Sequence, residues 1–404
     1  MCGRSPGRRH VKCLRLFPAR PGVLAVRNQM LKIALIRQRY AQDGGAERFV
    51  ARALDALKTQ DVRLTLVARE WSGGDGFEVL TCRPFHVGRL WRDYAFARCV
   101  CRTLAQKRFD LVQSHERIAC CDVYRAGDGV HREWLKQRAR TLGWGGRLGL
   151  ALNPYHAYVK AAEKTMFTGP RLKAVICNSR MVRDEIKQYF HLPDDRLPVI
   201  YSGVDTALYH PDLKKHRDAI RAHHGVPSEA ILYLFVGSGF ERKGMSVLLQ
   251  AMAKLPENAF LLVVGRDKQA SRFQQRAHAL GLSRRVIFAG AQEDVRPYYG
   301  AADVLTLPSL YDPFPNVVLE AMASGLPVVT SLKCGAAELI ENGKNGFACD
   351  ALDVEGQAAF LHTLLDAQTR RRMGLAARQT MEPLTLTAMS DRLVRLYREL
   401  LAKP

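Results

Sequence analysis

Two carboxylates separated by seven residues lie in the stretch SLYDPFPNVVLEAMASGLPVVTS, residues 309–331. Asp312 is in a proline-bounded loop that follows a predicted strand, and Glu320 is in the apolar helix that comes next. In open parallel sheets, the loops at the carboxyl ends of the strands form the edge where ligands bind. We therefore expect both carboxylates to face a ligand. The alternative is that Glu320 is an ordinary solvated carboxylate on a helix surface.

The helix that carries Glu320 is predicted to be buried over most of its circumference, because most of its residues are apolar. Its polar positions, Asn316, Glu320 and Ser324, are spaced four residues apart and form one narrow stripe that faces either solvent or a cleft. Gly325 is suited to end the helix, and the apolar pair at 328–329 predicts the next buried strand. Asn316 is thus a second candidate for contact with a ligand, beside Glu320.

Two adjacent cations occupy another predicted strand-to-helix turn, SGFERKG at residues 238–244. Arg242 and Lys243 lie where a helix N-terminus and two positive charges can bind a diphosphate. Surface charge is the alternative, but a turn at the ligand-binding edge favours a role in binding an anion. Arg266 follows the next predicted strand, in VVGRDKQ, and is a further candidate.

A glycine pair, Gly44 and Gly45, separates a predicted strand at 31–36 from a predicted helix at 46–57. Glycines in such a loop allow backbone N–H groups and the helix N-terminus to point at a phosphate or another anion. A plain tight turn is the competing interpretation.

Two more polar residues follow predicted strands in the first half of the chain. His115 ends the segment LVQSH, and Asp128 lies in AGDGVH. A lone histidine is more often structural than functional, and an aspartate in such a place often stabilises a turn. Their location at strand ends nevertheless makes both residues candidates for contacts with a substrate.

Predicted strands and helices alternate along the whole chain, which indicates an α/β fold with parallel doubly wound sheets. The strands are predicted at 31–36, 62–67, 79–82, 111–114, 123–126, 174–177, 199–201, 231–237, 260–264, 286–288, 304–308 and 328–329. With 404 residues, the chain is long enough for two domains. We divide it into a basic, disordered extension at 1–29, a first domain at 30–205, a second domain at 206–385 and a C-terminal helix at 386–404.

The net charge of +22 implies an anionic partner. Nucleic acid is disfavoured because the basic residues are dispersed and no recognised binding motif is present. Residues 132–187 combine basic side chains with Trp134 and Trp144, which indicates docking to an anionic membrane surface. Arg138, Arg140 and Arg147 are the cations we expect to take part. A merely solvated basic face is the alternative.

The ten cysteines are scattered without any Cys-x-x-Cys motif or ligand spacing typical of zinc. We interpret Cys99, Cys101, Cys120 and Cys121 as core thiols in a reducing cytosol. No apolar run approaches the length of a membrane span. Residues 1–29 also lack the apolar segment of a secretory signal.

The spacing of Asp312 and Glu320 within DPFPNVVLEAMASGLPVV resembles the signature of the retaining, nucleotide-sugar-dependent glycosyltransferases of family 4, where the first acid is usually Glu. The resemblance implies the GT-B fold, in which two Rossmann-like doubly wound parallel-sheet domains face a central cleft. It further implies that residues 30–205 bind the acceptor and residues 206–385 bind the nucleotide sugar. The C-terminal helix is then expected to pack back across the cleft.

The same resemblance assigns roles to single residues. Catalytic roles around the donor sugar and its diphosphate are implied for Asp312, His115 and Lys243. Donor binding is implied for Gly44, Gly45, Arg242, Lys243, Arg266, Asn316 and Glu320. A carboxylate such as Glu320 can accept hydrogen bonds from both ribose hydroxyls, and Asp128 is expected to meet the acceptor. Because no Asp-x-Asp motif occurs, we expect transfer without a metal ion and without a cofactor other than the nucleotide sugar.

Three segments, GSGFERKG, VVGRDKQ and DVLTLPSLYDPFPNVVLEA, are similar to bacterial enzymes that add the first glucose to a heptose of the lipopolysaccharide inner core. The similarity implies that glucose is transferred from UDP-glucose to a phosphorylated, lipid-linked glycan by a cytoplasmic protein on the inner membrane. The alternatives are transfer of N-acetylglucosamine or mannose to another lipid-linked or polysaccharide acceptor, a nucleotide-sugar epimerase of similar fold, and a non-catalytic anion-binding protein.

Overall fold

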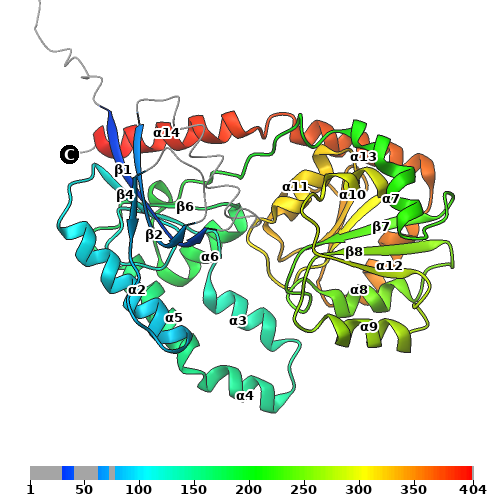
Figure 1. The fold of residues 1–404 in the computed structure, drawn as a ribbon, viewed down its shortest axis with the longest axis horizontal. Coiled ribbons are helices and arrows are strands. Elements are labelled where there is room, and N and C mark those ends of the chain that lie inside the picture. Colours follow the sequence, from blue (N-terminus) through cyan, green and yellow to red (C-terminus); the bar gives the residue numbers. More distant parts are fainter. Residues whose placement is uncertain (1–29, 41–61, 72–77, 403–404) are drawn as a thin grey trace, which may run out of the picture.

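The computed structural model describes residues 30–40, 62–71 and 78–402. The strands in these ranges form two six-stranded sheets, each with helices packed on it (Figure 1). The recorded pairings within both sheets are parallel, which confirms the predicted α/β fold. The predictions for residues 1–29 and for Gly44, Gly45 and the helix after them lie outside the described residues.

The first sheet has the strand order β3-β2-β1-β4-β5-β6. Its strands are β1 (Leu31–Tyr40), β2 (Val62–Trp71), β3 (Glu78–Thr81), β4 (Leu111–Ser114), β5 (Val123–Arg125) and β6 (Ala174–Ile176). The strand predicted at 199–201 is not formed, because the pairing of this segment beside the end of β6 is limited to one residue. Val199 forms an isolated bridge with Cys177 instead.

The second sheet has the strand order β12-β11-β10-β7-β8-β9. Its strands are β7 (Ile231–Val236), β8 (Ala259–Val264), β9 (Val286–Gly290), β10 (Val304–Leu307), β11 (Val328–Ser331) and β12 (Gly346–Cys349). Strands β7 and β10 are neighbours near the middle of the sheet, although about seventy residues separate them in the chain. Their carboxyl ends therefore bring two distant loops together.

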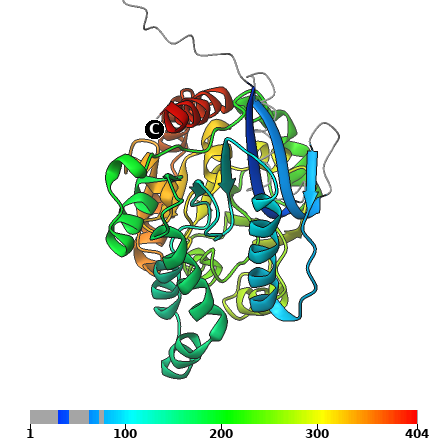
Figure 2. The same ribbon diagram turned by 90° about the vertical axis from the view of Figure 1, so that its left-hand side faces the viewer.

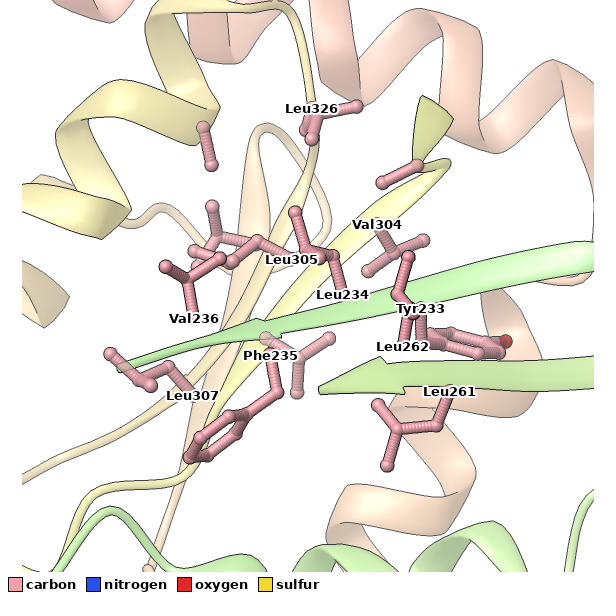
Figure 3. Packing of buried hydrophobic residues seen from close by; sticks show 14 of the residues in the cluster. Tyr233, Leu234, Phe235, Val236, Leu261, Leu262, Val304, Leu305, Leu307 and Leu326 are labelled. Atoms are coloured by element: carbon pink, nitrogen blue, oxygen red, sulfur yellow. The ribbon is translucent and has the colours of Figure 1, made fainter. Parts of the chain in front are cut away.

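Continuous apolar runs form the central strands of the second sheet because helices cover both of its faces. Tyr233, Leu234 and Phe235 of β7 are fully buried, and Figure 3 shows them packed with side chains of β8 and β10. Helices α8, α9 and α12 lie on one side of this sheet, and α7, α10, α11 and α13 lie on the other (Figure 1). Their bounds are α7 Arg217–His223, α8 Met245–Met252, α9 Ala270–Ala279, α10 Arg296–Ala301, α11 Asn316–Ala323, α12 Val354–Thr363 and α13 Ala367–Met381.

Helix α14 (Leu386–Ala402) follows the second sheet in the chain but packs on the first. Its apolar side chains Leu393 and Val394 lie in one buried cluster with β1 residues Ile33 and Leu35. Figure 1 shows the helix running alongside the first sheet. The other face of the first sheet is covered by helices of the first half of the chain. They are α2 (Gly88–Ala105), α5 (Pro154–Phe167) and α6 (Arg180–Phe190).

Helices α3 (His131–Ala139) and α4 (Trp144–Leu152) extend away from the first sheet and return through α5. Figures 1 and 2 both place α4 at the tip of this projection, at the edge of the molecule. No residue of α4 is buried. Across the described ranges, no helix is long and apolar enough to cross a membrane.

The interpretation of Cys101 and Cys120 as thiols is wrong, because the structure joins them in a disulfide. Helix α2 brings Cys101 next to the loop after β4, and the two Cα atoms lie 5.7 Å apart. This proximity depends on how α2 packs on the sheet, which the spacing of cysteines in the sequence does not reveal. Cys99 and Cys121 are free thiols, as expected.

Candidate active site

The loops after β7 and β10 meet in a compact cluster of one carboxylate and two cations. Lys243 Nζ donates a hydrogen bond to Asp312 Oδ2 over 2.5 Å. Arg242 NH1 donates to the same oxygen over 3.1 Å, and also to the Tyr311 carbonyl over 3.1 Å. The structure therefore brings together three of the residues that the sequence singled out. The side chains of Lys243 and Asp312 are about nine-tenths buried, whereas that of Arg242 is 38% exposed.

Gly244 allows these two loops to approach each other. It has a φ of +78°, and a Cβ atom there would overlap the Pro308 carbonyl oxygen at the end of β10. Only glycine combines this backbone conformation with so close an approach. Glycine at this position consequently holds the Arg242–Lys243 turn against the loop that carries Asp312.

The cluster keeps Asp312 ionised and leaves a net positive charge. Burial alone would raise the pKa of Asp312, but the charges and hydrogen bonds of Lys243 and Arg242 outweigh it and hold the pKa below its ordinary value. Two cations and one carboxylate leave one unit of positive charge at the carboxyl edge of the sheet. Such a group is suited to an anionic ligand such as a diphosphate.

Glu320 is buried inside the second domain, so the interpretation of it as a solvated carboxylate is wrong. Its residue exposure is 1%, and Oε2 accepts a hydrogen bond from the Tyr299 hydroxyl of α10 over 2.8 Å. Helix α11 begins at Asn316, which is half-buried, and Gly325 follows its end with a φ of +78°, as predicted. Glu320 lies one turn farther along the helix than Asn316.

The loop after β11 completes this edge of the second sheet. Asp312 N donates to the Lys333 carbonyl over 3.0 Å, and Gly335 N donates to the Asp312 carbonyl over 2.8 Å. The 3₁₀ helix η3 (Gly335–Leu339) begins directly after this pairing. Its Glu338 carboxylate accepts hydrogen bonds from the Arg180 backbone N–H at the start of α6, so the loop also joins the first domain.

Arg266 is exposed at the end of β8, on the same edge of the sheet. The next residue, Asp267, ties this loop to the one after β7, because its Oδ2 accepts a hydrogen bond from Phe240 N over 2.7 Å. Arg266 is therefore on the edge that carries Arg242 and Lys243.

His115 and Asp128 lie at strand ends of the first sheet. His115 is buried, with Nε2 3.2 Å from Gln113 Nε2. Burial, followed by the nearby charges of Arg125 and Arg37, lowers the pKa of His115 well below its ordinary value, so the ring is neutral at pH 7. Asp128 is 56% exposed and forms an ion pair of 3.5 Å with Arg117.

A polar cluster beside Asp128 was not predicted. Arg117 Nε donates to Glu163 Oε1 over 2.8 Å, and His131 N donates to the same oxygen over 3.0 Å. His131 Nε2 lies 3.0 Å from His156 Nδ1. Burial, with Arg117 and His156 adding to it, lowers the pKa of His131 to about 3. The sequence carries His131 three residues after Asp128, but no local pattern links either residue to Glu163.

Metal ligands are not grouped in the part of the chain that the structure describes. No set of three or more His, Cys, Asp or Glu side chains in those ranges could hold a metal ion. The candidate site is thus an arrangement of cations, carboxylates and backbone N–H groups at the carboxyl edges of the two sheets.

Two Rossmann-like parallel sheets with a C-terminal helix returning to the first define the GT-B class of fold. The crystal structure of WaaG, a glycosyltransferase involved in lipopolysaccharide biosynthesis, superimposes with a TM-score of 0.79, at 24% identity, over 90% of this chain and 99% of that one. Anabaena HepE in complex with UDP-glucose has a TM-score of 0.72, at 21% identity, over 91% of this chain and all of that one.

Both halves of the chain match glycosyltransferase family models. Residues 43–208 match the model described as Glycosyltransferase Family 4, and residues 216–380 match the one described as Glycosyl transferases group 1. The chain belongs to these GT-B glycosyltransferases and is therefore a transferase.

Two curated relatives match this chain over most of their own length. Lipopolysaccharide glucosyltransferase WaaG of Escherichia coli is 28% identical over 321 residues, which cover 78% of this chain and 84% of that protein. Lipopolysaccharide core biosynthesis glycosyltransferase LpsE of Rhizobium meliloti is 25% identical over 350 residues, covering 85% and 92%. The predicted relationship to lipopolysaccharide core glycosyltransferases is confirmed at this level of similarity.

The cation cluster gives a first prediction. Lys243→Ala should reduce turnover about 100- to 1000-fold, as the loss of one preorganised electrostatic contact does elsewhere, and should weaken UDP binding. Initial rates and titration calorimetry with UDP measure the two effects. Lys254→Ala is the matched control, because Lys254 forms an exposed ion pair with Glu355 outside the cluster. Turnover within about tenfold of the wild-type rate would exclude Lys243 from the site.

Proposed function

We propose that the protein is a retaining hexosyltransferase that transfers glucose from UDP-glucose to a heptose of a lipopolysaccharide core. The observation that carries the proposal is the buried Lys243–Asp312 pair with Arg242 beside it. The relationship to WaaG and LpsE supports the choice of sugar and acceptor. The UDP-glucose complex of the structural neighbour HepE supports the choice of donor.

In this proposal, the cations stabilise the departing diphosphate. Lys243 and Arg242 take the place that a divalent metal ion has in other nucleotide-sugar enzymes, and negative charge develops beside them as the glycosidic bond to UDP breaks. Preorganised charges stabilise such a transition state because they need little reorganisation during the reaction. The reaction accordingly needs neither a metal ion nor a cofactor besides the nucleotide sugar.

The other candidates surround the sugar and the nucleoside. The Asp312 carboxylate accepts hydrogen bonds from the sugar hydroxyls, and the neutral His115 ring accepts or donates one there. Glu320 and Asn316 bind the ribose. Arg266 and the Gly44–Gly45 loop contribute to donor binding. Asp128 orients the acceptor hydroxyl, which attacks from the face that UDP leaves, so the anomeric configuration is retained. The departing phosphate takes the proton of the attacking hydroxyl.

Acceptor-dependent release of UDP tests the function. Purified protein should form free UDP from UDP-glucose when a heptose-terminated lipopolysaccharide core is added, with glucose appearing on the core by mass spectrometry. An epimerase would instead interconvert the nucleotide sugar without acceptor, and a non-catalytic binding protein would form no UDP. Faster transfer from UDP-N-acetylglucosamine or GDP-mannose would contradict the choice of glucose.

The membrane partner is also a proposal, and the projecting helix α4 supports it. Its side chains Trp144, Leu148 and Leu152 are 82%, 46% and 73% exposed. Large apolar side chains beside basic residues fit the headgroup level of an anionic membrane. We propose that this helix docks the protein on the cytoplasmic face of the inner membrane, where a lipid-linked acceptor is available.

The three arginines named from the sequence are not equivalent. Arg140 forms a two-pronged ion pair with Asp350 of the second domain, with distances of 2.8 and 3.0 Å. Arg147 Nε donates to the carbonyl oxygens of Ala139 and Leu142 and so fixes the end of α3. Arg138 is exposed on the same projection. Of these three, Arg138 is the suitable position for a charge-reversal test, because changing it leaves the domain contact intact.

Vesicle binding tests the membrane proposal. The protein should bind vesicles of phosphatidylcholine with phosphatidylglycerol better than pure phosphatidylcholine, and binding should fall with salt because the attraction decays within about 8–10 Å at physiological ionic strength. Trp144→Ala and Arg138→Glu should each weaken it and leave transfer to a soluble core fragment unchanged. Leu375→Ala, at an exposed leucine of α13, is the control. Equal binding to both vesicle types would contradict the proposal.

A further inference from the structure

Tyr311 directly precedes Asp312, but its phenol reaches into the first domain. The hydroxyl donates a hydrogen bond to Glu185 Oε2 of α6 over 2.6 Å. It also accepts one from the Val130 backbone N–H, just before α3, over 2.9 Å. With 2% exposure, the side chain is buried at the junction of the two domains.

The first domain is shaped to receive this phenol. Gly129 has a φ of +66°, and a Cβ atom there would overlap the Tyr311 hydroxyl oxygen. Gly129 lies between Asp128, the candidate acceptor residue, and Val130, which caps α3. The acceptor-side loop and the loop of Asp312 are thus in direct contact through one hydroxyl group.

A second contact across the domains runs parallel to the first. Lys333 Nζ lies 2.9 Å from Glu185 Oε1 and 3.0 Å from Glu133 Oε1 of α3. Both carboxylates are buried, and Glu133 also accepts hydrogen bonds from Gln137 and Tyr189. Buried carboxylates left without their cation are strongly disfavoured. Lys333 therefore holds α3 and α6 against the second domain.

The two contacts converge on Asp312. The Lys333 backbone carbonyl accepts a hydrogen bond from the Asp312 N–H. Tyr311 is the residue directly before Asp312 in the chain. A displacement of α3 or α6 relative to the second sheet is therefore transmitted to the Asp312 carboxylate from both sides. Small displacements of a reacting group change rates strongly, because efficient catalysis depends on the alignment of the reacting atoms.

We infer that Tyr311 and Lys333 are positioning residues that couple the acceptor-side segment, residues 128–133, to the Asp312–Lys243 cluster. They touch neither reacting atom. They fix Asp312 relative to the acceptor loop. Changing either residue should therefore lower the turnover rate more than it lowers the affinity for the nucleotide. The inference rests on the proposed function, because the reaction whose groups these residues align is the proposed sugar transfer.

Tyr311→Phe removes only the hydroxyl group and is the decisive variant. Tyr233→Phe is its matched control, because the Tyr233 hydroxyl is also buried but donates to Leu361 O within the second domain. We expect kcat of Tyr311→Phe to fall about tenfold or more below that of the control, within the usual range of coupling between sites. The Kd for UDP should stay at the wild-type value, and both variants should lose similar thermal stability.

Lys333 provides an independent variant. Lys333→Met should lower kcat with UDP affinity unchanged, whereas Lys333→Arg should recover most of the activity because a guanidinium can bind both carboxylates. Equal kcat values for Tyr311→Phe and Tyr233→Phe would overturn the inference, as would a loss of UDP affinity as large as the loss of kcat. A wild-type protein that neither binds UDP nor transfers sugar would instead refute the proposed function.

Discussion

A buried lysine and a buried aspartate must lie in contact, because either charge alone would be strongly destabilised away from water. Lys243 and Asp312 meet this requirement because β7 and β10 are adjacent in the second sheet. Their loops consequently leave the sheet side by side, and Gly244 lets the loops touch. The arrangement of the candidate active site depends on this one contact between segments that are far apart in the chain.

Charged side chains at the domain junction are also paired with side chains of opposite charge. Glu133 and Glu185 from the first domain share Lys333 from the second, and Arg140 pairs with Asp350 in the opposite sense. Burial raises the pKa of Glu185 although Tyr311 and Lys333 oppose it, and the pKa of Lys333 is raised by both carboxylates in spite of its own burial. The domains are thus joined by polar contacts between specific pairs of charged side chains.

The sequence was sufficient to predict the fold and the residues of the central cluster. Continuous apolar strands, alternating helices and the glycine after α11 are local features, and they predicted most elements of the described residues, whereas the strand predicted at 199–201 is reduced to an isolated bridge. Arg242, Lys243 and Asp312 could also be found, because residues that follow buried parallel strands gather at one edge of a sheet.

Glu320 was identified, but its burial against Tyr299 was not, since that contact depends on the packing of α10 on α11. The contacts of Tyr311 with Glu185 and of Arg140 with Asp350 join residues more than a hundred positions apart. The Cys101–Cys120 disulfide likewise required the packing of α2.

A crystal structure of the protein in complex with UDP-glucose would show directly whether the Lys243–Asp312 cluster binds the diphosphate. The diphosphate should lie within hydrogen-bonding distance of Lys243 Nζ and the Arg242 guanidinium, with the ribose hydroxyls at Glu320. Asp312 should then exchange at least part of its contact with the cations for a hydroxyl of the glucose. A nucleotide bound elsewhere, with the Lys243–Asp312 pair unchanged and Arg242 still bonded to Tyr311 O, would contradict this prediction.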